Sequence, residues 1–255
     1  MKNLLIYLCI LTNMLLAQNQ QAEKILNTVF SEIVNKNGVA IEFDYWFENS
    51  SYQMEKPITG MIVLYANNKF YLEFYSEENK IIQMYDGDAL STILIEEKEI
   101  QIDHLTEESG FFIQDIFNNY KFKFHSNIGQ PLNKNTIINL TPIKEYKKEE
   151  FNNCIDELQL PNCLKLPKQC RIGIDSINQK LLDDCLQFKK GYKKNNVLNI
   201  AIEIDTLMNK LISITQLDEY QGKTQIVINK LGKKDENYLK IDSTIYKDFE
   251  IIDLR

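Results

Sequence analysis

The sequence predicts a mainly β protein, with one antiparallel sheet of about ten short strands and a few amphipathic helices. Two patterns predict this class. Apolar and polar residues alternate along most of the 255-residue chain, and short turns rich in Asn, Asp and Gly separate the alternating runs. Helical spacing of apolar residues interrupts the alternation in only a few places. A parallel nucleotide-binding sheet is not expected, because strands and helices do not alternate regularly.

The first elements are a helix and three strands. Apolar residues at helical spacing predict a helix over residues 21–36 that ends near Gly38. The dipeptide Asn67-Asn68 suits a tight hairpin turn between two alternating runs. The alternation in this part of the chain predicts strands at 39–48, 60–65 and 69–75.

A meander with a second helix follows. Asp86-Gly87 is a strong signal for a short hairpin. A polar start at Thr106 and apolar residues at helical spacing predict a helix within 103–119. The other alternating runs predict strands at 80–86, 89–95, 98–102, 120–125, 135–141, 197–205, 210–219, 223–231 and 249–252.

Residues 144–196 break this rhythm and are interpreted as an insertion. The segment is rich in lysine and contains two helical patterns, around 151–158 and 174–188. It also holds four cysteines, which in an exported chain favour two disulfides in any of three connectivities: Cys154, Cys163, Cys170 and Cys185. Their spacing contains no close pair, so a zinc site is weakly supported.

The N-terminus has the features of an export signal. Lys2 precedes an apolar run that ends at the small residue Ala17, which predicts a signal peptide at residues 1–17 and a periplasmic protein. An uncleaved anchor is the second interpretation, although the apolar run is short for a membrane span. The mature chain is expected to form a single domain over 18–255 that contains the insertion.

Composition and motifs argue against several function classes. The formal charge of −7 and the pI near 5.1 oppose nucleic-acid binding, which needs a basic surface. Only His104 and His125 are present, and no phosphate-binding loop or nucleophile motif appears. We therefore expect no enzyme, no catalytic residues, no metal site and no cofactor.

Several segments, taken in order, resemble the LolA family of periplasmic lipoprotein carriers. The chain has a helix beginning QAEKILNTVFSEIV, then GMIVLYANNKFYLEF and MYDGDALSTILIEEKEIQI, a Phe-rich helix before KFKF, INLTPIK, and the ending DFEIIDLR. The resemblance covers nearly all of the mature chain except 144–196. One departure is Ala66, which stands where the best-known members have an arginine that bonds to the lid.

The resemblance implies a curved, incompletely closed antiparallel β-barrel whose concave face is covered by a helical lid. Phe70 matches the family's functional aromatic position in the hairpin strand. The residues that the resemblance places on the lipid-binding face are Val39, Ile41, Phe43, Tyr45, Phe47, Phe70, Leu72 and Phe74. Those that it implies as lid contacts are Ile25, Val29, Phe112, Ile113, Ile116 and Phe117.

The function that the resemblance implies is carriage of lipoprotein acyl chains from the inner to the outer membrane, with the acyl chains bound in a vacant hydrophobic cavity between sheet and helices. The expected partners are acylated lipoproteins, an inner-membrane lipoprotein-releasing ABC transporter and an outer-membrane acceptor, and the protein is expected to be a monomer. An alternative hypothesis is an envelope sensor that binds lipid or lipoprotein on the same fold. A secreted hydrolase is a third, for which the sequence offers no nucleophile–base pair.

Overall fold

The fold is described from a computed structural model. The residues described are 19–33, 38–75, 79–105, 112–129, 135–165, 174–193, 196–234, 236–241 and 244–255. The predicted signal peptide lies outside these ranges. The chain divides into two compact units, which we name the sheet unit (Met1–Thr141 and Val197–Arg255) and the helical unit (Pro142–Asn196).

The sheet unit contains one twelve-stranded sheet, in the order β12-β6-β5-β4-β3-β2-β1-β11-β10-β9-β8-β7. From β6 to β8 along this order, neighbouring strands pair antiparallel, whereas β12 runs parallel to β6. The predicted fold class, mainly β with helices, is confirmed. The strands are β1 (Val39–Glu48), β2 (Ile58–Leu64), β3 (Phe70–Tyr75), β4 (Lys80–Tyr85), β5 (Leu90–Leu94), β6 (Glu99–Asp103), β7 (Phe124–Ile128), β8 (Thr136–Pro142), β9 (Val197–Asp205), β10 (Lys210–Asp218), β11 (Lys223–Lys233) and β12 (Glu250–Asp253).

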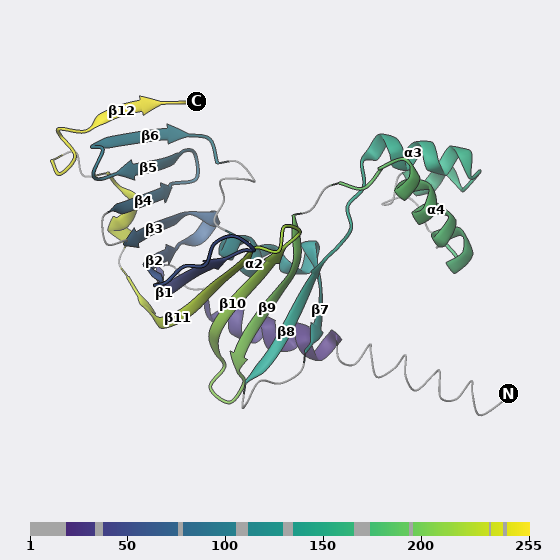
Figure 1. Ribbon diagram of the computed structural model, residues 1–255, viewed down its shortest axis with the longest axis horizontal. Helices are drawn as coiled ribbons and strands as arrows, with labels where there is room; N and C mark the ends of the chain where they lie inside the picture. The colour runs from purple at the N-terminus through teal and green to yellow at the C-terminus, as the bar shows by residue number, and fades with distance from the viewer. Residues whose placement is uncertain are drawn as a thin grey trace. The chain divides into compact units, whose positions relative to one another are not determined.

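Two helices, the N-terminal helix at residues 19–33 and α2 (Phe112–Lys123), lie on one face of the sheet (Figure 1). The strand expected at 120–125 is wrong, because α2 continues to Lys123 and β7 begins at Phe124. The repeat Lys121-Phe122-Lys123-Phe124 fits a strand by alternation. The chain is nevertheless helical here, because Tyr120 continues the apolar spacing of α2 and packs against Phe30 of the N-terminal helix.

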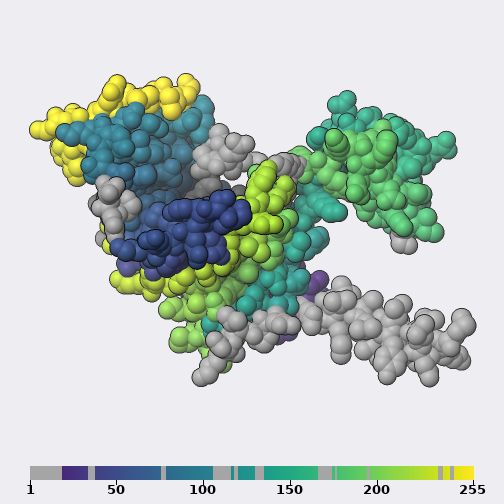
Figure 2. Space-filling view, viewed as in Figure 1, coloured from purple at the N-terminus to yellow at the C-terminus, as the bar shows by residue number. Residues whose placement is uncertain are grey.

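The opposite face of the sheet has its own core under the C-terminal segment. Buried side chains of β2 to β6, such as Tyr71, Ile82 and Ile93, pack with Tyr238 and Phe249 from that segment. Figure 2 shows the C-terminal residues in yellow against the blue strands β4 to β6. The two faces of the sheet are therefore covered by different parts of the chain.

Among the described helices, none is long and apolar enough to cross a membrane.

The predicted turns at Asn67-Asn68 and Asp86-Gly87 are present. Asn67 and Asn68 have φ angles of 61° and 60°, in the left-handed region that asparagine tolerates. At the second turn, the Asp86 carboxylate accepts hydrogen bonds from the Asp88 and Ala89 amides, at 2.9 and 3.1 Å. These turns fix the register of the β2–β3 and β4–β5 hairpins.

The helical unit consists of α3 (Lys148–Glu157), α4 (Ser176–Phe188) and the 3₁₀ turn η2 (Asn162–Lys165), as the helical patterns predict. A disulfide joins Cys154 of α3 to Cys185 of α4. Cys163 is also disulfide-bonded, and Cys170 lies outside the described residues. Together with Phe151, Leu182 and other apolar residues, Cys154 forms a small core within this unit. The disulfide stabilises a unit whose core is small.

Gly60 of β2 leaves the space that an aromatic ring fills. Its neighbours in the sheet register are Phe43 on β1 and Phe74 on β3. A Cβ atom at Gly60 would lie 2.5 Å from Cζ of Phe43 and 2.9 Å from the Glu73 carbonyl oxygen. The Phe43 ring, which is 1% exposed, therefore depends on glycine at this position.

Gly60→Ala is expected to destabilise the sheet unit by about 1–3 kcal/mol, because the added methyl group displaces the Phe43 ring. Urea unfolding followed by circular dichroism measures this change. Gly232→Ala is the control, since a Cβ there meets nothing within 4 Å. Equal stability of the two variants would show that Gly60 has no such role.

Candidate functional site

The eight residues predicted to bind lipid lie along one face of β1 and β3. Five of them are no more than 3% exposed, and they belong to the main core: Val39, Ile41, Phe43, Phe70 and Leu72. Tyr45 and Phe74 are half-buried and pack against the same core. Phe47, also half-buried, continues the same alternation and stacks on Tyr52 with a centroid distance of 6.4 Å. The structure thus brings the predicted residues together, and their lipid-binding role remains a prediction.

We name this surface the helix-covered face. It extends from β3 across β2 and β1 to β11, β10, β9 and β8, each of which contributes buried aliphatic or aromatic side chains. The strand contributions from beyond β1 to β3 are Leu90, Ile138, Leu140, Ile200, Ile202, Ile204, Leu211, Ile214, Ile226 and Ile228. Strand alternation explains this face, since every second side chain points to the helices.

The N-terminal helix and α2 supply the cover. From the helix at 19–33, Ala22, Leu26, Val29, Phe30 and Ile33 enter the same core. Predicted lid residues Ile116 and Phe117 of α2 are buried in it, and Ile25 packs at its border. The side chains of Phe112 and Ile113 lie outside the described residues.

An aromatic cluster and the Tyr120 hydroxyl connect the two helices. The Phe30 ring meets the rings of Phe117 and Tyr120 edge-on, with centroid distances of 4.8 and 5.5 Å. The Tyr120 hydroxyl donates to the Asn27 side-chain oxygen at 2.9 Å. Ala66, noted in the sequence for lacking the expected arginine, begins a 3₁₀ turn (Ala66–Asn68) and has no polar side chain. The Tyr120–Asn27 hydrogen bond joins α2 to the N-terminal helix.

The expectation of a vacant cavity on this face is not met. The helix side chains and the sheet side chains form one continuous buried core over the described residues. This arrangement follows from the sequence of the N-terminal helix, whose wide apolar stripe packs against the sheet. A ligand on this face must therefore take the place of helix side chains.

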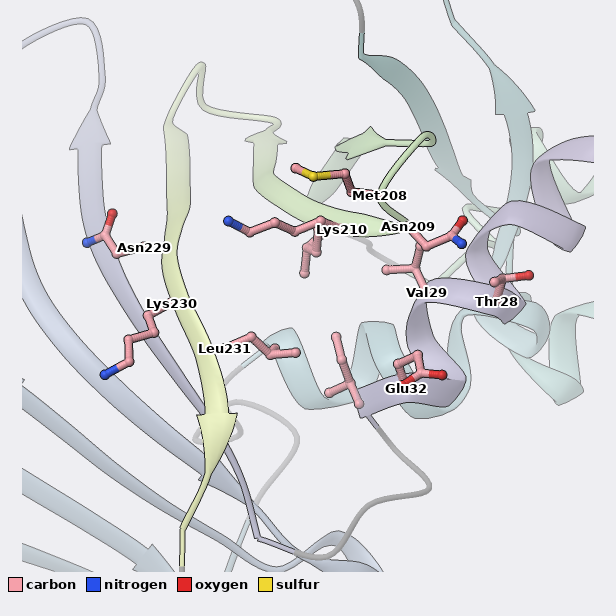
Figure 3. A pocket seen from close by; sticks show the side chains of 11 residues that line it. Thr28, Val29, Glu32, Met208, Asn209, Lys210, Asn229, Lys230 and Leu231 are labelled. Carbon is pink, nitrogen blue, oxygen red and sulfur yellow. The ribbon is translucent and has the colours of Figure 1, made fainter.

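Two open grooves border the N-terminal helix. The first, of about 580 Å³, lies between this helix and the strands β10 and β11, with Val29 and Leu231 on opposite walls. Figure 3 shows Met208 and Lys210 from the hairpin side of this groove and Thr28 and Glu32 from the helix side. The second, of about 740 Å³, lies between the helix and Ile128 at the end of β7. Both volumes are in the range of small-ligand pockets.

The helix-covered face becomes more polar beyond β3. In one register row, Leu72 of β3 is followed by Gln83 of β4, Thr92 of β5 and Gln101 of β6. The Gln83 amide donates to the Thr92 hydroxyl at 3.4 Å. Beyond β3 the helix-covered face receives only a few apolar side chains, such as buried Leu90 of β5 and partly buried Tyr85 of β4.

Sequence reasoning missed Tyr120, Asn27 and the two grooves. Tyr120 continues the spacing of Ile116 and Phe117, but the alternation after it favoured a strand. Asn27 is polar and lies beside the apolar stripe, so only the contact with Tyr120 reveals its role. Within the described parts of the chain, no group of His, Cys, Asp or Glu could hold a metal ion.

Burial raises the pKa of the Tyr120 phenol to about 12, and the nearby Glu23 carboxylate adds to this effect. The folded state therefore favours the neutral phenol. The contribution of this phenol to the free energy of unfolding is present below pH 10 and is lost as the pH rises towards 12. In that range the unfolded chain releases the phenol proton more readily than the folded chain does.

Comparison with known proteins identifies similar solved structures only. No family model and no curated protein matches the chain. A LolA superfamily protein from Nitrosomonas europaea matches at 8% identity and a TM-score of 0.36, over 88% of this chain and 96% of that one. LolA-type proteins are thus among its structural matches. LprF from Mycobacterium bovis matches at 11% identity and a TM-score of 0.41, over 85% and 95% of the two chains.

A further match is an uncharacterised conserved protein from Thermus thermophilus, at 7% identity and a TM-score of 0.46, over 91% of this chain and 99% of that one. TM-scores and identities as low as these carry no argument about function.

Tyr120→Phe is expected to lower stability at pH 7 by about 0.5–1.5 kcal/mol, because the hydrogen bond to Asn27 is lost. It is also expected to reduce the loss of stability between pH 10 and 12, since the buried phenol no longer titrates. Urea unfolding at several pH values measures both effects. Asn27→Ala keeps the phenol and should retain the alkaline loss. An unchanged alkaline slope in Tyr120→Phe would contradict the assigned environment.

Proposed function

We propose that the protein is a lidded carrier that binds the acyl chains of lipoproteins on the helix-covered face. The observation that carries the proposal is the cover itself. An apolar face that extends over β1 to β3 and β8 to β11 is closed by two helices through side-chain packing, and open grooves border one of them. A face built this way can exchange its cover for another apolar group.

The free energies of the two covers are comparable. Burial of Leu26, Val29, Phe30 and Ile33 contributes about 6–12 kcal/mol at about 1.5–3 kcal/mol for each side chain. A long acyl chain gains on the order of 10 kcal/mol at about 0.8 kcal/mol per buried methylene. Exchange between helix and acyl chain is therefore close to balanced. Such a balance lets a carrier bind its cargo tightly and still release it.

The transport steps follow from the expected location. An export signal at residues 1–17 would deliver the chain to the periplasm, where an acyl chain must cross an aqueous space. In this proposal an inner-membrane ABC transporter loads the carrier, and an acceptor or the outer membrane unloads it. The protein acts by binding and has no catalytic step.

Phe30→Ala tests the exchange of cover for cargo. The substitution removes a buried side chain of the lid, which should lower stability by about 3–5 kcal/mol. It should also raise the affinity for a fluorescent palmitoylated peptide by about fivefold or more, because less packing competes with the ligand. Fluorescence titration of the purified mature protein measures the affinity, and urea unfolding measures the stability.

Ile93→Ala is the matched control. Ile93 is fully buried in the core on the opposite face, so its truncation lowers stability without loosening the lid. It should leave the peptide affinity unchanged. Failure of the wild-type protein to bind the palmitoylated peptide and to release lipoprotein from spheroplasts would refute the carrier proposal. Equal affinity gains in both variants would refute the role of the lid.

A further inference from the structure

The first groove leads directly to side chains of the buried core. Val29 and Ile33 of the N-terminal helix and Leu211 of β10 line this groove, and all three also belong to the core of the helix-covered face. None of the residues described as lining the second groove is among the buried residues of that core. Of the two grooves, the first is therefore the one that reaches side chains under the helical cover.

A β-bulge in β11 turns Leu231 towards the helices. The register of β1 against β11 shifts between Glu42 and Phe43, which leaves one extra residue in β11. Beyond this bulge Leu231 pairs with Ile41, and paired residues of antiparallel strands point to the same face. Ile41 is buried in the core, so Leu231 also belongs to the helix-covered face. Without the extra residue, strand alternation would turn Leu231 to the opposite face.

Leu231 lies in the groove and is only partly covered. It is 43% exposed, on the wall of the first groove opposite Val29 (Figure 3). Met208, which is 67% exposed, lines the same groove from the β9–β10 hairpin. Two large apolar side chains thus border an open groove that also contains core residues. A further apolar group in the groove would complete their burial.

The charges beside the first groove nearly cancel. Lys230 pairs with Glu42 at 3.3 Å, and Lys210 lies opposite Asp205 in the register of β10 and β9. Glu32 adds one more carboxylate from the helix side. The described surroundings of this groove therefore offer no excess positive charge to an anionic group. An uncharged hydrocarbon chain suits the groove better than a charged ligand does.

We propose that the acyl chain of the cargo enters the helix-covered face through the first groove, and that Leu231 is the residue that it contacts first. This inference rests on the proposed carrier function. The chain would lie between Leu231 and Met208 while the cover is still closed, and would then replace Val29 and Ile33 in the core. Entry from this side lets the exchange proceed in steps, since methylenes replace each helix side chain as it leaves the core.

Association kinetics test this entrance. Stopped-flow fluorescence with the palmitoylated peptide measures the association rate constant of the mature protein. Leu231→Asp should lower this rate constant about tenfold or more, because the carboxylate loses hydration beside the methylenes. Met208→Asp should lower it about threefold or more for the same reason. Leu231→Ile keeps an apolar side chain of the same volume and should change the rate constant by less than about twofold.

Leu217→Asp is the matched control. Leu217 has a similar exposure of 40%, and it lies three residues beyond buried Ile214 in β10, so alternation places it on the other face of the sheet. This variant should associate as the wild type does, and circular dichroism checks that each variant is folded. Absence of binding by the wild type would overturn the carrier function together with this entrance. If the wild type binds, an unchanged rate constant in Leu231→Asp, or an equal loss in Leu217→Asp, would overturn the entrance alone.

Discussion

The packing of the N-terminal helix against the sheet is the interaction on which the rest of the structure depends. Together with α2, its residues Leu26, Phe30 and Ile33 close the helix-covered face, and without them much of that apolar face would lie open to water. The same contacts define the candidate site, because five of the eight residues predicted to bind lipid are buried in this core. In the proposed carrier, folding stability and ligand binding therefore compete for one surface.

Different parts of the chain cover the two faces of the sheet. One face is closed by the C-terminal segment, through contacts such as the edge-on pair of Tyr71 and Tyr238 at 4.9 Å. The other is closed by the two helices and bordered by grooves. Since β2 and β3 contribute to both cores, the C-terminal cover would keep the sheet folded during the proposed exchange of the helical cover.

Much of this fold follows from periodicity, and the site follows from it only in part. Alternation along β1 correctly groups Val39, Ile41 and Phe43 on one face, and the turns at Asn67 and Gly87 appear where asparagine and glycine predict them. Alternation cannot tell whether a face is vacant or filled, because cavity walls and packed cores have the same pattern. The end of α2 was missed for a related reason, since Tyr120 is held by a contact 93 residues away in sequence.

Hydrogen exchange of the N-terminal helix tests the central claim most directly. The amides of residues 19–33 should lose protection when saturating palmitoylated peptide is added, because a helix of this length is marginally stable once its packing is lost. The amides of β1 should stay protected, as they remain paired with β2 and β11. Full retention of helix protection while the peptide is bound would contradict the exchange of helix for acyl chain.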